Sequence, residues 1–294
     1  MKNSAEKSIQ NIYADASGLS IKLLDTRFGP MEYAHYGSGK PVLVIHGNGG
    51  GFDQGVGLAR GYISDGFQVI APSRFGYLGS PVPSGASVAD QCEVYARLLD
   101  SMGIQQTVIF ATSAGVTSAI QFALRYPQRV SKLILLSPNA PGEVDLKLPP
   151  KSVFKMVMHN NTFYRALITL FRPVMHSLVG VPKGFKLTPG FKAEVKMALA
   201  GVMPVNLRTD GIIFDTYVSN PEINRYPLGE VKAPTLVISA VDDPMALYKN
   251  ALTLAKQIPN ARMLSIPDGG HLLLGHAGET RQQICQFLNE NLAM

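Results

Sequence analysis

The sequence predicts an α/β fold with a mostly parallel central sheet flanked by helices. Continuous apolar runs such as "PVLVIHGNGG" (41–50) are typical of central parallel strands, which are buried on both faces. Strand-like runs alternate with amphipathic helix-like runs, which is the pattern of repeated βαβ units. This alternation stops once, after Pro141, and resumes near Tyr226. We therefore predict one α/β core, at residues 1–140 and 227–294, interrupted by a helical insertion at 141–226.

The individual elements follow from the periodicity of the apolar residues. "SIKLLDT" (20–26) and "MEYAHYG" (31–37) alternate apolar and polar positions, which predicts an edge hairpin. Before the insertion, further strands are predicted in "PVLVIHGNGG", "FQVIAPSR" (67–74), "TVIFAT" (107–112) and "SKLILLSP" (131–138), with helices at 88–102 and 114–126. After the insertion we predict a strand in "APTLVISAVDDP" (233–244), a helix at 246–257, a strand in "ARMLSIPDGGH" (261–271) and a closing helix at 279–292.

The composition predicts a globular protein. The chain has 294 residues, of which 46% are hydrophobic and 16% charged. Its first residues, "MKNSAEKSIQNIYADASG", contain no apolar core of a signal peptide, and no run of about 18 uncharged apolar residues predicts a transmembrane helix. Cys92 and Cys285 lie far apart without metal-ligand spacing, so two free thiols are expected. These features together predict a cytoplasmic protein.

The positive charge is concentrated in the insertion. The net charge is +6, and residues 146–192 contain eight Lys or Arg and no Asp or Glu. A basic segment in an otherwise slightly acidic chain argues against nucleic-acid binding, for which a more uniformly basic protein is expected. The same segment carries apolar residues at roughly helical spacing, namely Phe154, Val157, Met158, Phe163, Leu167, Leu170 and Phe171. We expect them to face the sheet and roof a pocket for an apolar substrate. The alternative is an interfacial helix that docks on anionic lipid, a peripheral membrane contact that we do not favour.

A sharp change from strand to helix occurs within "VIFATSAGVTSAIQFALRYP" (108–127). "ATSAG" stands at the turn, and a serine at the tip of such a turn projects its hydroxyl above the sheet, where small neighbours are required. Ala111 occupies the first glycine position of the G-x-S-x-G pattern, while Gly115 is retained. Ser113 is therefore the candidate nucleophile. The simpler alternative is a serine that caps the following helix.

Polar residues follow four of the predicted strands, at the edge of the sheet where ligands bind in open parallel sheets. They are His46-Gly47-Asn48, Ser113, Asp242-Asp243 and His271. A nucleophilic serine needs a base, and the base needs an acid that orients it. The chain order of serine, acid and histidine, with "HGNGGG", "ATSAG", "VDDP" and "GGH" at strand ends, resembles the α/β-hydrolase superfamily over nearly the whole chain.

The resemblance implies a role for each of these residues. Ser113 would be the nucleophile, His271 of "GGH" the base, and the insertion the cap. Asp243, three positions beyond Ala240, is preferred as the acid over Asp242, which would otherwise cap the turn before Pro244. His276 is the alternative histidine and would otherwise start a helix.

The resemblance also implies where an oxyanion would bind. Donors of this kind are backbone N–H groups held ready for the developing charge. One is expected from Ala114, directly after the nucleophile, and the other from Asn48 or, second, Gly49. In the family, a histidine such as His46 supports this loop.

Other site classes are excluded by their motifs. "GNGGGF" fails the G-x-G-x-x-G pattern of dinucleotide sites at Phe52, and no phosphate-binding G-x-x-x-x-G-K-[ST] motif is present. Arg74 is then the one residue that suits a dinucleotide, since it could bind a 2′-phosphate. Zinc-ligand spacing is also absent, so neither a cofactor nor a metal is expected. A serine nucleophile argues against haloalkane dehalogenases and epoxide hydrolases.

The predicted function is hydrolysis of a small apolar carboxylic ester. The alternatives are a hydrolase of carbon–carbon bonds in ring-fission products and a non-catalytic ligand-binding protein of this fold.

Overall fold

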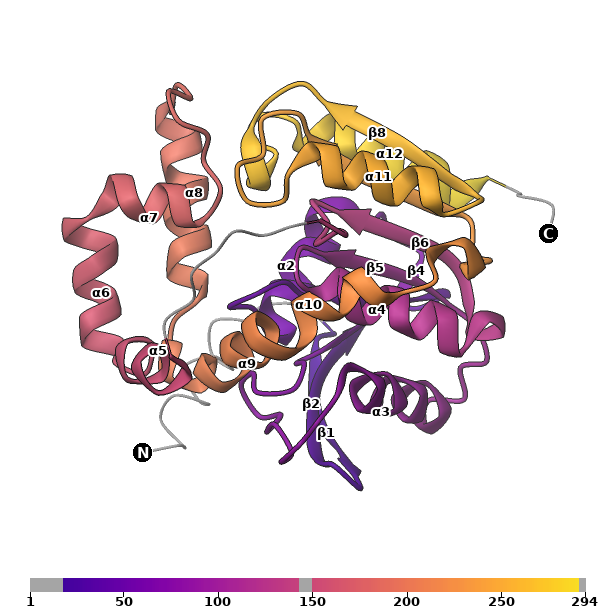
Figure 1. The fold of residues 1–294 in the computed structure, drawn as a ribbon. Coiled ribbons are helices and arrows are strands. Elements are labelled where there is room, and N and C mark those ends of the chain that lie inside the picture. The colour runs from indigo at the N-terminus through magenta and orange to yellow at the C-terminus, as the bar shows by residue number, and fades with distance from the viewer. Residues whose placement is uncertain (1–17, 143–149, 291–294) are drawn as a thin grey trace.

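The computed structural model describes residues 18–142 and 150–290 and contains one eight-stranded sheet (Figure 1). Its strands are β1 (Ser20–Thr26), β2 (Gly29–Tyr36), β3 (Lys40–Ile45), β4 (Phe67–Pro72), β5 (Thr107–Thr112), β6 (Val130–Leu136), β7 (Thr235–Ala240) and β8 (Ala261–Ile266). The spatial order is β1-β2-β4-β3-β5-β6-β7-β8. Strand β2 pairs antiparallel with both of its neighbours, and all pairs from β4 to β8 are parallel. This confirms the predicted mostly parallel sheet.

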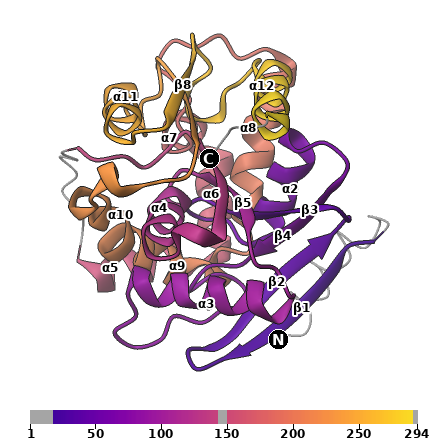
Figure 2. The same cartoon turned by 90° about the vertical axis from the view of Figure 1, so that its right-hand side faces the viewer.

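Helices cover both faces of the sheet, as Figure 2 shows. One face carries α2 (Phe52–Tyr62) and α12 (Ala277–Asn289), and the other carries α3 (Val88–Ser101), α4 (Gly115–Arg125) and α11 (Tyr248–Gln257). Two separate apolar cores result, one between each helical layer and the sheet. The predicted strands and helices of the core are present with bounds that differ by a few residues. The last residues of the predicted closing helix, 291–292, lie outside the described part of the chain.

Helix α2 was not predicted from the sequence. Its residues, FDQGVGLARGY, include three glycines, which are poor helix formers. A methyl group on Gly55 would lie 2.9 Å from Cβ of Ala71 on β4, so the glycine allows close packing of the helix on the sheet. Here tertiary packing outweighs intrinsic helix propensity.

The described chain between β6 and β7 is mainly helical, with a longer non-helical stretch between α7 and α8. It forms α5 (Lys151–Met158), α6 (Asn161–Leu170), α7 (Arg172–Leu178), α8 (Pro189–Gly201), α9 (Thr209–Phe214) and α10 (Asn220–Glu222), with a π-helical turn at Asp215–Ser219. We call residues 150–226 the insertion. Figure 1 shows α5 to α8 beside the sheet, with α6 and α7 on the side away from it. Within residues 18–142 and 150–290, no helix is both long enough and apolar enough to cross a bilayer.

The insertion has a small apolar core around Tyr164, Met175, Val195 and Leu199, and Tyr77 and Leu274 of the α/β core complete this cluster. Of the seven apolar residues expected to face the sheet, Phe154, Met158 and Leu167 pack against this core. Phe163, Leu170 and Phe171 are instead exposed, so the expectation is wrong for these three. The side chain of Val157 lies outside the described part. The exposure of Phe163, Leu170 and Phe171 follows from a break in the predicted helix. Asn160 caps a new helix, so the register changes between Met158 and Phe163.

Candidate active site

Ser113 lies in the tight turn between β5 and α4. Its φ of 51° is in the left-handed region, which is uncommon for a residue with a side chain and is typical of functional turns. The turn is held by hydrogen bonds from Ser113 N–H to the Leu136 carbonyl, at 3.0 Å, and from Asn139 N–H to the Ser113 carbonyl, at 3.1 Å. A methyl group on Gly115 would lie 2.4 Å from the His46 carbonyl oxygen, so this position requires glycine. Ala111 is fully buried in the core, and its methyl group is accommodated there.

The turn brings Ser113 to His271, which comes from the loop after β8. Ser113 Oγ lies 3.0 Å from His271 Nε2, and His271 Nδ1 lies 2.8 Å from Asp243 Oδ2. A carboxylate accepts hydrogen bonds, so Nδ1 carries the proton and Nε2 accepts from the serine hydroxyl. The Asp243 side chain is fully buried, and its Oδ1 accepts the N–H groups of Met245 and Ala246 at 2.8 and 2.9 Å. This hydrogen-bond chain can move a proton from the serine to the histidine.

The two alternative residues have other contacts. Asp242 accepts the N–H groups of Gly269 and Gly270, at 3.3 and 2.9 Å, so it holds the loop before His271 and does not cap the turn before Pro244. His276 is the residue before α12, where its Nε2 lies 2.8 Å from Asp268 Oδ1. The structure therefore joins Ser113 to His271 and Asp243, and joins neither alternative to the serine.

Backbone N–H groups near Ser113 differ in their availability. Across the described residues, those of Ala114 and Asn48 donate to no protein acceptor. The Gly49 N–H points to the Tyr77 hydroxyl at 3.4 Å. Asn48 is exposed and Ser113 is half-buried, so this edge of the site is open to solvent. Of the two loop positions expected to bind an oxyanion, Asn48 has the free donor.

His46 holds the loop that contains Asn48. Its Nε2 accepts the Arg74 N–H at 2.9 Å, and its Nδ1 donates to the Gly47 carbonyl at 2.8 Å. The ring is completely buried, and this burial, together with the Arg74 charge, lowers its pKa well below the ordinary value. A neutral imidazole with the proton on Nδ1 satisfies both contacts. This geometry matches a supporting role for His46.

Sequence reasoning missed two buried ion pairs that join the insertion to this loop. Arg74 binds both carboxylate oxygens of Asp215, at 2.5 and 2.6 Å, and donates to the Gly47 carbonyl at 3.1 Å. Burial opposes the charge on Arg74, but the neighbouring Asp215 carboxylate holds its pKa above the ordinary value. The Tyr77 hydroxyl donates to the same carboxylate and lies 3.2 Å from Asn48 Oδ1. Because its guanidinium is bound to Asp215, Arg74 is not free to bind a dinucleotide phosphate.

The second pair joins Arg208 of the insertion to Asp53 at the start of α2. Their closest atoms, Arg208 Nη2 and Asp53 Oδ2, are 2.5 Å apart, and Arg208 also donates to the Gly50 carbonyl. Arg208 is fully buried. No local pattern in the sequence marked these residues, since each partner lies far along the chain. A buried arginine next to a glycine-rich loop becomes visible only in the folded protein.

The insertion also contacts His271 directly. The Gly180 carbonyl of the insertion accepts the His271 N–H at 3.0 Å. Ser137, which follows β6 and lies outside the insertion, donates its hydroxyl to the His271 carbonyl at 2.9 Å. A methyl group on Gly180 would lie 2.2 Å from His271 Cβ and 3.1 Å from Met245 Sδ. On the other side of the site, a methyl group on Gly49 would lie 3.2 Å from Val202 Cγ2. The insertion therefore meets the histidine through the Gly180 backbone and the glycine-rich loop through the apolar side chain of Val202.

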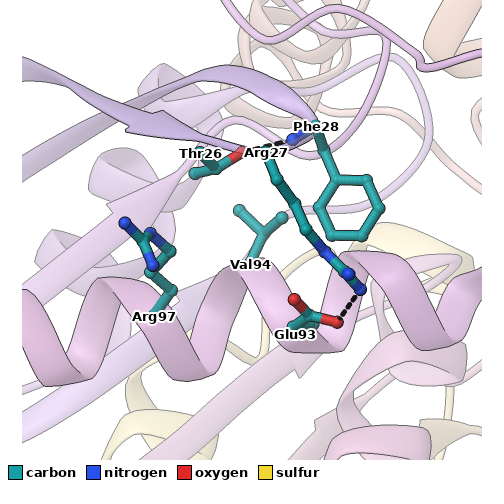
Figure 3. A pocket seen from close by; sticks show the side chains of 6 residues that line it. All are labelled: Thr26, Arg27, Phe28, Glu93, Val94 and Arg97. Carbon is teal, nitrogen blue, oxygen red and sulfur yellow. Dashed lines mark hydrogen bonds and ion pairs between the residues drawn. The ribbon is translucent and has the colours of Figure 1, made fainter.

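Two surface depressions lie beside other elements, and Ser113 lines neither. One, of about 110 Å³, lies between the hairpin turn and α3, where Arg27 stacks on Phe28 and pairs with Glu93 (Figure 3). The other, of about 600 Å³, lies between the insertion and the loop after β8, near Asp242 and His276.

Among the described residues, no group of three His, Cys, Asp or Glu is placed to hold a metal ion. Cys92 and Cys285 are free thiols, as predicted.

A family model described as alpha/beta hydrolase fold matches residues 40–275. The chain is an α/β hydrolase. Among curated relatives of this hydrolase, 2-hydroxymuconate semialdehyde hydrolase of Pseudomonas putida is 30% identical over 265 residues, covering 86% of this chain and 89% of that protein. Lipase 1 of Psychrobacter immobilis is 27% identical over 286 residues, covering 92% and 84%. An alpha/beta hydrolase fold protein from Nakamurella multipartita has a TM-score of 0.70 at 25% identity, covering 92% of this chain and 99% of that one.

The relatives of this α/β hydrolase carry names that denote different substrates. One name denotes a semialdehyde hydrolase and another a lipase, at similar identity. Membership of the family therefore establishes a hydrolase and leaves the scissile bond to be argued from the site.

Proposed function

We propose that this α/β hydrolase cleaves small carboxylic esters with apolar groups, using Ser113, His271 and Asp243 as a catalytic triad. The observation that carries the proposal is the continuous hydrogen-bond chain between these residues, at a serine whose backbone is held at φ 51°. A serine that only capped a helix would not need a buried acid and a histidine. In this proposal the insertion is the cap of the site.

The proposed reaction follows from the geometry. Ser113 Oγ attacks the ester carbonyl carbon while His271 Nε2 takes the hydroxyl proton, and Asp243 stabilises the resulting imidazolium. The N–H groups of Ala114 and Asn48 bind the oxyanion, each contributing about 2.7–4 kcal/mol. His271 then protonates the leaving alcohol. Water, activated by the same histidine, hydrolyses the acyl-enzyme and restores the free serine.

The surroundings of the site support an apolar, uncharged substrate. Val202 and Met245 stand next to Gly49 and His271, and both are apolar. The two guanidinium groups that contact the glycine-rich loop, Arg74 and Arg208, are each bound to a buried carboxylate. Neither is available to bind an anionic substrate group. A muconate semialdehyde carries a carboxylate, so this arrangement favours an ester.

Carbon–carbon hydrolysis is the second candidate, and the relative from Pseudomonas putida favours it. It would use the same serine and histidine but would require His271 or water to protonate a carbanion equivalent. The two reactions are separated by a substrate panel of p-nitrophenyl esters of increasing chain length and 2-hydroxymuconate semialdehyde. We expect turnover of the esters, and faster turnover of the semialdehyde would assign the second reaction.

The decisive experiment is intact-mass measurement after incubation with a fluorophosphonate. We expect a single adduct on the wild-type protein and on Ser152→Ala, which removes an exposed hydroxyl from α5. Ser113→Ala should form no adduct and should lose ester hydrolysis to a trace. An unlabelled wild-type protein would contradict an activated serine and would favour the non-catalytic ligand-binding alternative.

A further inference from the structure

Large apolar side chains are exposed mainly on one part of this protein. Within the described residues, twelve large hydrophobic side chains are exposed, and eight of them belong to the segment from α5 to α8, seven on the helices and Phe171 between α6 and α7. Large apolar side chains that gather on one part of a surface are uncommon on monomeric soluble proteins and mark interaction sites. The insertion therefore presents apolar side chains that the rest of residues 18–142 and 150–290 leaves exposed.

The exposed residues gather where α6 ends and α7 begins. Leu170, Phe171, Val174 and Leu178 are 72%, 54%, 58% and 61% exposed, and Phe171 both ends α6 and precedes α7. The spacing of Phe171, Val174 and Leu178 places them on one face of α7, and Phe163 and Leu170 share one face of α6. We call these five residues the apolar corner. Figure 1 shows α6 and α7 on the side of the insertion that faces away from the sheet.

The two helices that carry the apolar corner have charges of one sign, since Arg165 is the only Lys, Arg, Asp or Glu of α6 and Arg172 the only one of α7. Between residues 150 and 192 the chain has seven Lys or Arg and no Asp or Glu. Arg165 on α6 and Arg172 on α7 are exposed, and neither guanidinium pairs with a carboxylate in the described structure. Lys155, by contrast, is paired with Asp210. The corner thus combines a protruding apolar surface with two free positive charges.

We propose that the apolar corner docks on an anionic lipid surface. A bilayer interface accepts apolar side chains to a depth of about 5–10 Å and attracts Lys and Arg at the rim. A second copy of the chain would cover the apolar side chains but would bring Arg165 and Arg172 of both copies together without an acidic partner. Charge complementarity therefore selects anionic lipid over self-association.

Docking at this corner would attach to the lipid surface the same insertion that borders the catalytic residues. The insertion that carries the corner also contacts His271 through Gly180 and the glycine-rich loop through Val202. Lipid binding itself does not depend on the proposed ester hydrolysis. Ser113→Ala should therefore bind vesicles as the wild type does, so failure of one proposal is distinguishable from failure of the other.

The test is co-sedimentation of the full chain with vesicles of phosphatidylcholine alone or mixed with phosphatidylglycerol. We expect binding to the anionic vesicles, weaker binding at high salt because screening shortens the range of the charges, and little binding to phosphatidylcholine alone. Arg165→Gln/Arg172→Gln should weaken binding about 25-fold, at about fivefold for each positive charge removed. Leu170→Ser/Phe171→Ser should weaken binding at least tenfold, since about 0.8 kcal/mol is lost for each methylene group no longer buried.

Matched controls separate docking from misfolding. Leu23→Ser removes an exposed leucine from β1, which lies away from α6 and α7 (Figure 1), and should bind as the wild type does. The arginine double variant, the Leu170→Ser/Phe171→Ser variant and Leu23→Ser should all hydrolyse a soluble ester at the wild-type rate. Equal binding to neutral and anionic vesicles, or unchanged binding of both corner variants, would overturn the proposal. A dimeric mass in light scattering that becomes monomeric in Leu170→Ser/Phe171→Ser would assign the corner to a second copy instead.

Discussion

Replacing Asp215 with Asn tests whether the buried ion pair with Arg74 holds the insertion to the glycine-rich loop. The two side chains are 2% and 0% exposed, and the carboxylate accepts both guanidinium nitrogens as well as the Tyr77 hydroxyl. Asparagine has nearly the same shape and keeps one acceptor. The variant therefore removes the negative charge while leaving the arginine buried and still protonated.

The expected loss of stability follows from that burial. Removing one partner of a buried pair costs about 3–5 kcal/mol, because the remaining charge is left without compensation. Because asparagine keeps one oxygen acceptor, the loss of unfolding free energy in Asp215→Asn should lie near the lower end of this range, at about 3 kcal/mol. In a domain of this size that corresponds to a Tm lower by roughly 6 °C. Because the pair also steadies the loop carrying Asn48, kcat should fall by about tenfold, less than the 10²–10³ lost when an oxyanion donor is removed.

Urea unfolding and ester kinetics measure both effects, and a neighbouring pair provides the control. Asp210 also lies on the insertion and binds Lys155, but its side chain is 56% exposed. Asp210→Asn should cost no more than about 1 kcal/mol. Arg74→Met/Asp215→Leu should recover most of the stability lost in Asp215→Asn, since apolar replacements of a buried pair are often neutral. Equal losses in Asp215→Asn and Asp210→Asn would refute the reasoning.

Three further predictions concern the serine turn and the loop beside it. Gly115→Ala places a methyl group 2.4 Å from the His46 carbonyl oxygen and should lower kcat about 100-fold by displacing Ser113 by roughly 1 Å, which ester kinetics would measure. Ala111→Gly should leave kcat within about twofold while costing about 1–2 kcal/mol in urea unfolding, from the lost buried methyl group and added backbone freedom. The lowered pKa of His46 means that below its ordinary value of 6.5 the unfolded chain binds a proton that the folded chain excludes. Stability should therefore fall by up to about 1.4 kcal/mol per pH unit as the pH drops below 6.5, and His46→Gln should show a smaller slope in urea titrations at pH 5 to 7.

Much of the fold could be predicted because strands and helices are encoded by local periodicity. The run that forms β5 and the amphipathic run that forms α4 are each legible within a dozen residues. Ser113, Asp243 and His271 could be singled out because each follows a strand, and the ends of parallel strands meet at one edge of the sheet. Helix α2 escaped prediction because its glycines serve packing against β4, which no local pattern reveals.

By itself, then, the sequence determined the order of the elements, the strand ends at which polar residues stand, and the basic character of the insertion. Tertiary structure decided which of these residues meet. It paired Arg74 with Asp215, which lie 141 residues apart, and it turned Leu170 and Phe171 outward although their spacing suited an inward face. The physical reason is that hydrophobic periodicity specifies that a face is apolar, whereas the surface that covers it depends on distant parts of the chain.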